Sequence, residues 1–267
     1  MKNTRSVLIT GAYGGMGQAT ARLLAGQGYC VFALDKTIGD AQENIIPIEA
    51  DVTSEESIKA AYDLVRSKTE RLYGIIHFAG IYMLHSLAEL ETEAYDRIFD
   101  INVRGAFLIN KTFLPLLEQG SRIIMTTSEL APLDPLPFTG IYAITKTALD
   151  RYAYSLRMEL QLLGIKVSVL RAGAVSTGML GASTQALERF CENTQLYSCN
   201  AERFKAIVDG VEAKNIHPRK IARKISAILE QKRPAFAYAI NRNPLLLLLN
   251  ALPARMQFWI IRLILKN

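Results

Sequence analysis

The stretch SVLITGAYGGMG, residues 6–17, decides the fold of this 267-residue chain. Its first five residues favour a β-strand, and they lead directly into a glycine-rich turn. The next stretch, GQATARLLAGQG at 17–28, has the composition of a helix and ends in two glycines that favour termination. A second apolar run, YCVFALD, follows at 29–35. This order predicts a strand, a helix and a second strand, which together form a βαβ unit.

The same alternation continues along the chain. We predict further strands at 45–51, 73–80, 121–128, 165–173 and 233–240, and helices at 55–68, 92–118, 140–160 and 217–232. A capping box from Thr53 to Glu56 is predicted to open the helix at 55–68. Strands that are near-continuous apolar runs are typical of a parallel sheet buried on both faces. The sequence therefore predicts an α/β protein: a single-domain, Rossmann-type doubly wound fold with a mostly parallel seven-stranded sheet and helices on both faces.

Composition agrees with an ordinary globular protein, since 50% of the residues are hydrophobic and 21% are charged. No linker divides the chain, so we expect one domain over 1–267, with an insertion at 178–215 and a tail at 241–267. Three cysteines lack disulfide or redox spacing, and three histidines are scattered, so we predict no metal site. The N-terminus lacks the apolar core of a secretory signal. We therefore expect a cytoplasmic protein.

The glycine-rich turn has chemistry of its own. Gly11, Gly15 and Gly17 let the backbone approach a pyrophosphate, and the N-terminus of the following helix offers free N–H groups to its charge. The spacing is G-x3-G-x-G rather than G-x-G-x-x-G, but the preceding strand and following helix supply the required context. Asp35 ends the second predicted strand, eighteen residues beyond Gly17. A carboxylate there accepts hydrogen bonds from ribose hydroxyls and repels a 2′-phosphate, which favours NAD over NADP.

Further motifs follow in a fixed order: ADV at 50–52, AG at 79–80, NVRGAF at 102–107, Ser128, Tyr142-x-x-x-Lys146 and RAGAVST at 171–177. With these motifs, residues 5–240 resemble the short-chain dehydrogenase/reductase family. The resemblance implies that the single domain is an NAD-binding catalytic domain. It places Asp51 near the adenine and Thr177 at the nicotinamide carboxamide. The cofactor-binding residues that it implies are Gly11, Tyr13, Gly15, Met16, Gly17, Asp35, Asp51, Val52, Ala79, Gly80, Tyr142, Lys146, Val175 and Thr177.

The resemblance also implies a catalytic group of Asn102, Ser128, Tyr142 and Lys146. Residues four apart on a helix face the same way, so we expect Lys146 beside Tyr142. A nearby ammonium favours the phenolate, and we expect it to lower the pKa of Tyr142 from about 10 toward the range of a general base. Tyr142 would exchange a proton with the substrate oxygen, and Ser128 would hydrogen-bond that oxygen. Asn102 would hold a water that links Lys146 to solvent.

Some of these positions leave alternatives open. Ser128 stands fourteen residues before Tyr142, where thirteen is commoner in the family, so Glu129 is the alternative to Ser128. We favour the serine, because a carboxylate would oppose negative charge that develops on the reacting oxygen. Instead of a catalytic role, Ser128 could have a purely structural one as the cap of a strand end. Asn102 could likewise serve only to kink a helix. His77-Phe78 replaces the usual Asn-Asn of the family, which removes a polar contact near the cofactor.

Apolar segments at 81–84, 133–138 and 178–215 predict a small hydrophobic substrate. Our first interpretation is an NAD-dependent oxidoreductase that interconverts a secondary alcohol and a ketone, with a hydroxysteroid as the first guess. One alternative is an acyl-chain 3-oxo reductase, against which Asp35 argues because such reductions usually use NADP. Another is a non-catalytic dinucleotide-binding regulator, which would not need the complete catalytic group. We expect a homodimer or homotetramer.

The part of the chain after Glu230, which includes the tail, carries the excess charge. The formal net charge is 31 − 25 = +6, and six basic but no acidic residues follow Glu230. The tail sequence NPLLLLLNALPARMQFWIIRLILKN, at 243–267, is similar to the C-terminal ends of the hydroxysteroid and retinol dehydrogenase branch of the family. Single basic residues among apolar ones suit an anionic membrane surface better than nucleic acid. Prolines and arginines interrupt any spanning helix, which leaves peripheral membrane contact, a subunit interface and a lid as alternatives.

Overall fold

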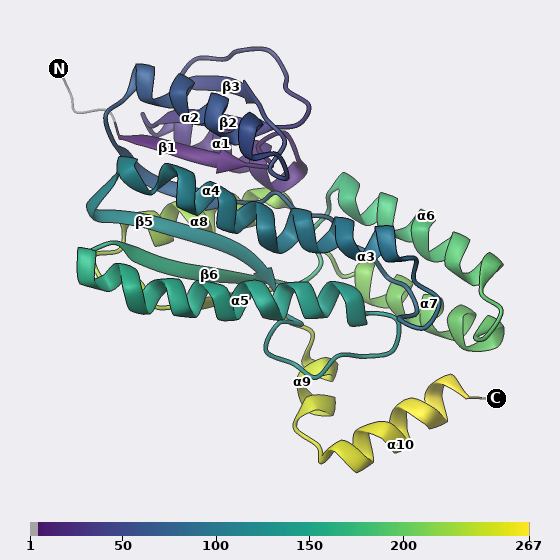
Figure 1. The fold of residues 1–267 in the computed structure, drawn as a ribbon. Helices are drawn as coiled ribbons and strands as arrows, with labels where there is room; N and C mark the ends of the chain where they lie inside the picture. The colour runs from purple at the N-terminus through teal and green to yellow at the C-terminus, as the bar shows by residue number, and fades with distance from the viewer. Residues whose placement is uncertain (1–4, 267) are drawn as a thin grey trace.

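The computed structural model describes residues 5–266, apart from the side chains of residues 179, 180, 182, 183 and 212. Seven strands form one sheet in the order β3-β2-β1-β4-β5-β6-β7 (Figure 1). All neighbouring strands pair in parallel, so the predicted fold class is confirmed. The strands are β1 (Ser6–Thr10), β2 (Cys30–Asp35), β3 (Ile45–Glu49), β4 (Leu72–His77), β5 (Leu117–Ser128), β6 (Lys166–Ala172) and β7 (Ala237–Ile240).

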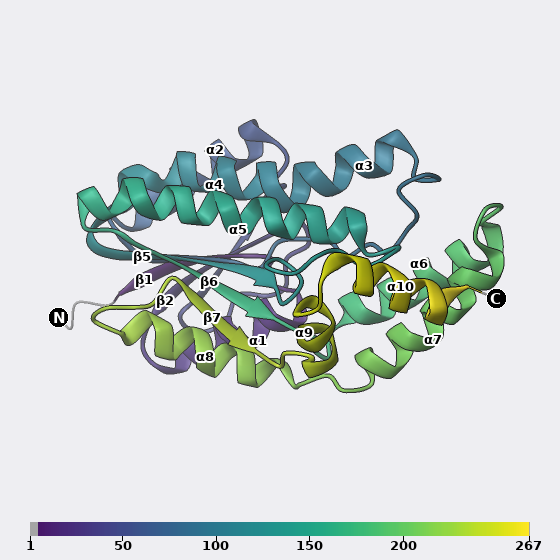
Figure 2. The ribbon, with the colours of Figure 1, turned by 90° about the horizontal axis from the view of Figure 1, so that it is seen from below.

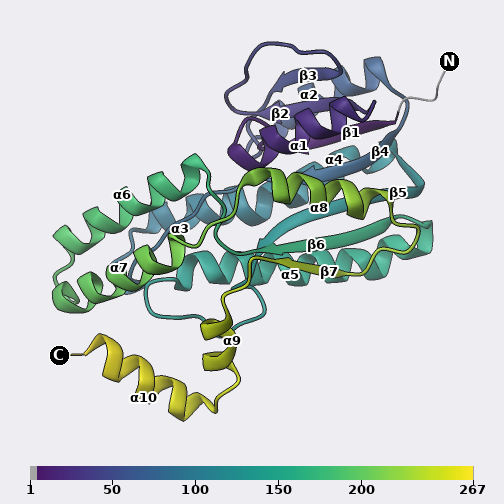
Figure 3. The same ribbon diagram turned by 180° about the vertical axis from the view of Figure 1, so that it is seen from behind.

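Helices cover both faces of this sheet, as Figure 2 shows from below and Figure 3 from behind. On one face, α1 (Gly15–Gly26) packs against α8 (Pro218–Glu230). The other face is covered by α2 (Glu55–Lys68), α4 (Gly105–Phe113) and α5 (Gly140–Leu160). The α5 bounds are those predicted from the sequence. Covering both faces explains why the central strands are apolar along almost their whole length.

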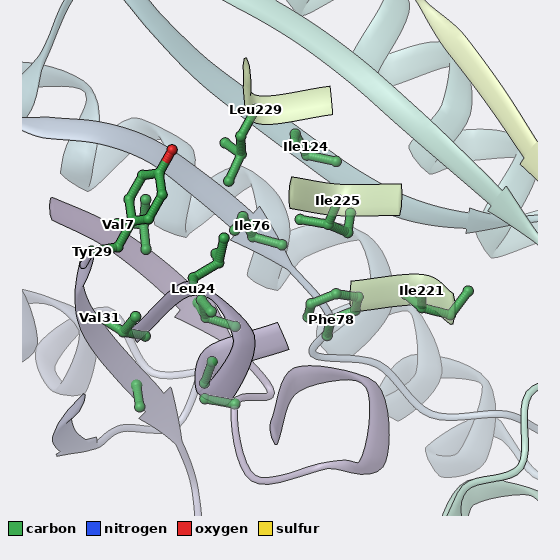
Figure 4. Packing of buried hydrophobic residues seen from close by; sticks show 14 of the residues in the cluster. Val7, Leu24, Tyr29, Val31, Ile76, Phe78, Ile124, Ile221, Ile225 and Leu229 are labelled. Carbon is green, nitrogen blue, oxygen red and sulfur yellow. The ribbon is translucent and has the colours of Figure 1, made fainter. Parts of the chain in front are cut away.

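The core beneath α1 and α8 is shown in Figure 4. Leu24 of α1 and Ile225 and Leu229 of α8 pack in one cluster with Val7 of β1 and Ile76 of β4, and none of these five is exposed. Burying a side chain of this size contributes roughly 1.5–3 kcal/mol. This cluster therefore holds β1 and β4, and the loops that follow them, in a fixed position.

The direction of winding reverses between β1 and β4. From β1 the sheet extends through β2 to β3, and on the other side from β4 to β7. The loops after β1 and β4 therefore diverge, and open parallel sheets bind ligands in the crevice at such a point. The loops are joined at their bases, because Ala79 N donates to Thr10 Oγ1 at 3.3 Å. This crevice is where the site should be sought.

The prediction that Thr53 caps α2 is wrong. The N-cap is Ser54, whose Oγ accepts a hydrogen bond from Ser57 N at 3.2 Å. Thr53 instead donates its backbone N–H and its hydroxyl to Asp51 Oδ1, at 2.9 and 2.7 Å. Thr53 thus acts as a donor to a carboxylate, and the acceptor at the start of the helix is the Ser54 hydroxyl.

The predicted helix at 92–118 is also divided. It consists of α3 (Thr92–Phe99), a π-helical turn at Asp100–Arg104, α4 and a 3-10 turn at Leu114–Leu116. Residues 117 and 118 already belong to β5. Pro115 favours the end of α4, because proline has no N–H for a helical hydrogen bond. The π-helical turn contains Asn102, and its cause lies in the site described below.

The insertion and the tail are both helical. Residues 178–215 contain α6 (Gly178–Asn193) and α7 (Ser198–Glu212), which pack together. The tail contains α9 (Pro244–Asn250) and α10 (Ala254–Leu265), and α10 packs beside α7. Figures 1 and 3 show α9 and α10 as an arm outside the layers that cover the sheet. Within residues 5–266, no helix has the length and apolar character needed to cross a membrane.

Candidate active site

A cleft opens where β4, β5 and β6 end, and its walls come from the following loops and from α5, α7 and α9. Part of its lining is polar, with Ser128, Glu129, Tyr142 and Lys146. Another part is apolar, with Phe204, Ile207, Val208, Val211 and Leu246. Such a lining suits a hydrophobic molecule that carries a polar centre.

Tyr142 and Lys146 lie one turn apart on α5, as predicted. Lys146 is buried, its Nζ lies 5.6 Å from the centroid of the Tyr142 ring, and it donates to Thr126 O at 3.3 Å. The Tyr142 ring packs edge-on against Tyr82, with ring centroids 4.6 Å apart. The helix and its neighbours therefore hold both side chains in place at the cleft.

The pKa of Tyr142 departs from the prediction. Burial raises it to about 12, although a hydrogen bond from Ser128 acts in the opposite direction. Lys146 was expected to lower the pKa of Tyr142, but its ammonium lies over the ring and donates to a backbone carbonyl. Burial also lowers the pKa of Lys146 to about 8. Desolvation is therefore the largest influence on the pKa of both groups.

Ser128, at the end of β5, lines the cleft together with Tyr142 and acts to lower the pKa of that phenol, while its Oγ accepts from Leu130 N at 3.2 Å. It therefore caps the strand end and faces the same cleft as Tyr142. Glu129, the alternative considered from the motif spacing, has a different role in the structure. Its Oε2 accepts from Asn243 N at 2.6 Å, which fastens the start of the tail to β5. Burial raises the pKa of this carboxyl.

Asn102 lies in the π-helical turn and clamps the loop after β4. Its Oδ1 accepts from Ile81 N at 2.8 Å, and its Nδ2 donates to Ile81 O at 3.0 Å and to Thr145 Oγ1 at 3.1 Å. A Cβ added at Gly80 would lie 3.1 Å from Asn102 Oδ1 and 3.4 Å from Lys146 Nζ. Asn102, Gly80 and Lys146 are therefore close neighbours in the structure. The wider turn lets the Asn102 side chain reach the loop.

The glycine loop forms a cradle that side chains would fill. Gly11 has φ +64°, and a Cβ there would lie 2.6 Å from Ala79 N. A Cβ on Gly17 would lie 2.1 Å from Gly11 O, and one on Gly15 would lie 2.7 Å from Thr177 Cγ2. The first turn of α1 has no side-chain cap and no acidic residue. The loop and the helix N-terminus therefore fit the pyrophosphate of a dinucleotide.

Asp35 lies beside this loop, at the end of β2. Its Oδ2 accepts from Tyr13 N and its Oδ1 from Lys36 N, both at 2.8 Å. Lys36 in turn pairs with Asp51 at 2.9 Å, and this hydrogen bond is the main reason why the pKa of Asp51 falls to about 2. Asp35, on which the predicted preference for NAD rests, therefore has a cation, Lys36, directly beside it in the chain. Next to Asp51, Val52 packs against Gly105, where a Cβ would lie 2.9 Å from Val52 Cγ2.

Only some of the predicted cofactor residues border the cleft. Its lining includes Met16, Gly80, Val175 and Thr177, whereas Tyr13, Asp35, Asp51 and Val52 are outside it. Val175 is buried, and Thr177 precedes α6. In the part of the chain that the structure describes, no group of three His, Cys, Asp or Glu side chains is placed to hold a metal ion.

Sequence reasoning missed the ion pair that fixes α5. The buried carboxylate of Asp150 accepts from Arg171 Nε at 2.9 Å and from Arg171 Nη2 at 2.8 Å. Asp150 is eight residues beyond Tyr142 on α5, and Arg171 is on β6. The signal in the sequence is the spacing: an acid two turns beyond Tyr142 lies on the same side of the helix and needs a partner.

His77-Phe78, the departure from the family pattern, is directed into the protein. His77 Nε2 donates to Asn110 Oδ1 at 2.9 Å, and Asn110 Nδ2 donates to Tyr152 Oη at 3.2 Å. Burial lowers the pKa of His77 to about 4. Phe78 belongs to the core and also lines the cleft. The His77 imidazole therefore hydrogen-bonds to Asn110 of α4, and the apolar ring of Phe78 faces the cleft.

Known proteins share sequence similarity with most of this chain. Residues 5–188 match the family described as short chain dehydrogenase. A 3-ketodihydrosphingosine reductase from Bacteroides thetaiotaomicron is 26% identical over 231 residues, which are 86% of this chain and 85% of that protein. The estradiol 17-beta-dehydrogenase 2 of Mus musculus is 32% identical over 190 residues, 67% of this chain. The matched region spans only half (50%) of the mouse protein.

Solved structures share the fold. A short chain dehydrogenase family protein from Francisella tularensis subsp. tularensis SCHU S4 has a TM-score of 0.74 at 22% identity, over 89% of this chain and 97% of its own. A 3-ketoacyl-(acyl-carrier-protein) reductase from Brucella melitensis, in complex with NADH, has a TM-score of 0.72 at 20% identity, over 88% of this chain and 96% of its own. At these identities the likeness concerns the fold alone.

Proposed function

Because the chain belongs to the short-chain dehydrogenase family and is an oxidoreductase, we propose that it uses NAD to interconvert a secondary alcohol and a ketone on a hydrophobic substrate. The observation that carries this proposal is that Ser128, Tyr142 and Lys146 line the same apolar-walled cleft, with Lys146 one helical turn from Tyr142 on α5. A protein that only binds a dinucleotide has no need of these three side chains together.

The chemistry that NAD supplies when bound is acceptance of a hydride from the carbinol carbon, which oxidises the alcohol and reduces the nicotinamide. Gly11, Gly15, Gly17, Asp35 and Thr177 would hold the dinucleotide. Tyr142 Oη takes the hydroxyl proton of the alcohol, and in the reverse direction it donates that proton to the ketone oxygen. Ser128 Oγ donates a hydrogen bond to the same oxygen while charge develops on it.

Burial favours the protonated form of Tyr142, since the pKa of its phenol is raised to about 12. A protonated phenol is ready to donate to a ketone oxygen. For the opposite direction Lys146 would help, because an ammonium near the phenol stabilises the phenolate as it forms. Asn102 helps to position Lys146, because it hydrogen-bonds Ile81 and Thr145, the residue before Lys146. We propose that Asn102 also holds a water beside Lys146.

A hydroxysteroid-like molecule remains our first candidate for the substrate. The far wall of the cleft is formed by Phe204, Val208 and Val211 of α7 and by Leu246 of α9. These side chains come from residues 178–215 and 241–267, which we propose as the substrate insertion and the tail of one catalytic domain. The mouse relative, named as an estradiol dehydrogenase, supports this class.

A second candidate is reduction of a long-chain 3-oxo compound that carries an amino group. The observation that favours it is the buried Glu129 carboxylate, which lines the cleft directly after Ser128. In an apolar surrounding the attraction between an ionised Glu129 carboxylate and a substrate ammonium is stronger than in water. The relative from Bacteroides thetaiotaomicron, which aligns over most of both chains, is named as a reductase of 3-ketodihydrosphingosine.

One experiment separates these candidates. Purified full-length protein is assayed by nicotinamide absorbance with NAD, NADP or their reduced forms against hydroxysteroids, retinol, acyl alcohols and long-chain 3-oxo amines. We expect turnover with a hydrophobic substrate and a lower KM for NAD than for NADP. Turnover of only the 3-oxo amines supports the second candidate. Binding of NAD without turnover of any substrate contradicts both and favours a regulator.

We also propose a cytoplasmic homodimer or homotetramer. The outer sides of α4 and α5 expose Phe107, Tyr154 and Met158, which gives these helices an apolar surface for a second subunit. Light scattering coupled to size-exclusion chromatography measures the mass directly. A mass of one chain, 29.7 kDa, at micromolar concentration would contradict this proposal.

A further inference from the structure

The tail helices α9 and α10 have an inner face that the protein uses. Gln257 is buried, and its Nε2 donates to Asp134 Oδ2 at 3.2 Å and to Leu252 O at 2.9 Å. Leu265 and Ile261 pack with the apolar cluster that includes Phe204 of α7. Gln257, Ile261 and Leu265 are four residues apart, so they form one stripe along α10. This stripe orients the helix on the body of the protein.

The outer face is apolar and exposed to solvent. The exposed fraction is 69% for Phe258, 65% for Trp259 and 65% for Leu263 on α10, and 68% for Leu245 and 64% for Leu248 on α9. Seen from below, α10 lies in front of α6 and α7, on the outside of the molecule (Figure 2). Scattered exposed apolar residues are ordinary, but five large ones on two consecutive helices indicate a binding surface.

The charged residues of the tail itself are all basic, and the acid that touches α10, Asp134, contacts its inner stripe through Gln257. Arg255, Arg262 and Lys266 are exposed on and beside α10, and no acidic residue follows Glu230 in the chain. Trp259 and Phe258 lie between these basic residues. Aromatic and apolar side chains flanked by isolated cations are typical of helices that lie in the headgroup region of a membrane.

We propose that the outer face of α9 and α10, defined by Leu245, Leu248, Phe258, Trp259 and Leu263, binds the surface of an anionic lipid membrane. Its cations match the negative potential of such a surface, each contributing to attraction within a Debye length. A second copy of the chain fits this face less well. A two-fold interface would set the face against itself, and its cations would then meet cations with no acid from the tail between them.

The geometry excludes insertion across the bilayer and favours a helix that lies in its plane. The twelve residues of α10 extend only about 18 Å, well short of a hydrocarbon core of about 30 Å. The fixed inner stripe keeps the apolar outer face directed away from the body. Docking needs no rearrangement of the described part of the tail.

This surface also adjoins the cleft. Leu246, between Leu245 and the rest of α9, lines the cleft, so bound lipid would lie near its apolar wall. A hydrophobic substrate would then reach the cleft from the membrane and not from water. This consequence rests on the proposed function, whereas the lipid contact does not.

The test uses full-length protein and two kinds of vesicle, one of phosphatidylcholine alone and one containing phosphatidylglycerol. Binding is measured by sedimentation and by the emission of Trp259, which is the only tryptophan of the chain. We expect sedimentation with the anionic vesicles, a blue shift of the emission, and weaker binding at high salt. Arg255→Gln combined with Arg262→Gln should weaken binding about 30-fold, from roughly 1 kcal/mol for each cation.

Two further variants keep the result interpretable. Phe258→Glu with Leu263→Glu should abolish sedimentation, while Leu162→Glu with Leu163→Glu, exposed apolar residues outside the tail, should leave it unchanged. Thermal unfolding and NAD binding check that each variant is folded. Three results would overturn the proposal: no binding to anionic vesicles, equal binding by the tail variants, or a Trp259 shift that depends on protein concentration without lipid. None of them depends on enzyme turnover.

Discussion

Ser128 and Glu129 are consecutive residues at the end of β5, and their side chains have different neighbours. Ser128 lines the cleft together with Tyr142, whereas the Glu129 carboxylate accepts a hydrogen bond from the backbone of the tail. We expect Ser128→Ala to lower kcat about 10²- to 10³-fold, because a donor to the developing oxyanion is lost. Glu129→Gln should leave kcat for a neutral alcohol within a few-fold of the wild-type value. Steady-state kinetics on both variants measure the difference.

The kinetics of Glu129→Gln could also contradict this assignment. If Glu129→Gln lost as much kcat as Ser128→Ala for a neutral substrate, Glu129 would be the residue that contacts the reacting oxygen. If instead it raised KM only for an amino ketone, the second substrate candidate would gain. Thermal unfolding controls for a loosened tail, since Glu129 also fastens Asn243.

His77 gives the protein a pH-dependent stability. Its pKa is about 4 in the folded protein against an ordinary value of 6.5, because burial disfavours the charged ring. The unfolded chain therefore takes up the proton first. Stability contributed by neutral His77 is complete above about pH 6.5 and is lost as the pH falls toward 4, by roughly 3 kcal/mol in total.

Urea unfolding between pH 7 and pH 4 measures this loss. We expect His77→Asn to be less stable at pH 7, since it gives up packing and a hydrogen bond, but to lose less stability on acidification. Equal slopes for the two proteins would show that His77 does not carry the acid sensitivity. His217, which caps α8 at the surface, offers a control substitution.

At the scale of elements, α5 is attached to β6 through Asp150 and Arg171. The pair is mostly buried, so removal of one partner leaves an uncompensated charge. We expect Asp150→Asn to destabilise the protein by about 3 kcal/mol and to lower kcat, because Tyr142 and Lys146 are on the same helix. Urea unfolding and steady-state kinetics give the two values.

The double variant Asp150→Asn with Arg171→Met completes this test. It should recover part of the stability lost by Asp150→Asn, since the unpaired guanidinium is gone. Recovery of stability without recovery of kcat would show that the pair positions the catalytic helix. Simple addition of the two losses would contradict direct coupling between the residues.

The elements show what a sequence can and cannot determine. Apolar runs and glycine stops predict the strands and α5, because local propensity and burial act in the same direction there. The π-helical turn was not predictable from local sequence. It depends on contacts between Asn102 and Ile81, which are 21 residues apart in the sequence and become neighbours only in the fold. The cap at Ser54 was misplaced by one residue because Thr53 and Ser54 are both good caps, and Asp51 decides between them.

Some features of the candidate site could likewise be predicted from the sequence, and others could not. Spacing on one helix predicted that Tyr142 and Lys146 lie side by side, whereas the grouping of Asn102 and Ser128 with them was implied only by the family resemblance. The direction of the Tyr142 pKa shift was not predicted, because it depends on desolvation and on where the Lys146 ammonium points. The Asp150–Arg171 pair was also missed, since the partner of a helical acid on a distant strand is fixed only by the fold.

At the scale of the whole molecule, the parallel sheet places its binding loops at one edge. The loops after β1 and β4 diverge there, α5 delivers Tyr142 and Lys146, and α7 and α9 close the apolar side. The same arrangement leaves the outer face of α9 and α10 free to contact lipid. The proposed function and the proposed lipid contact would thus place a dinucleotide cradle, a proton-transfer group and a hydrophobic entrance in one fold.

The central claim is that Tyr142 performs the proton transfer in an NAD-dependent oxidation or reduction. The most direct measurement compares hydride transfer and NAD binding in the wild-type protein and in Tyr142→Phe, with the substrate found by the panel. We expect unchanged NAD affinity by calorimetry and a rate lowered at least about 10²-fold, since only the phenolic hydroxyl is removed. A Tyr142→Phe variant that retains a rate within a few-fold of the wild-type value would contradict the claim.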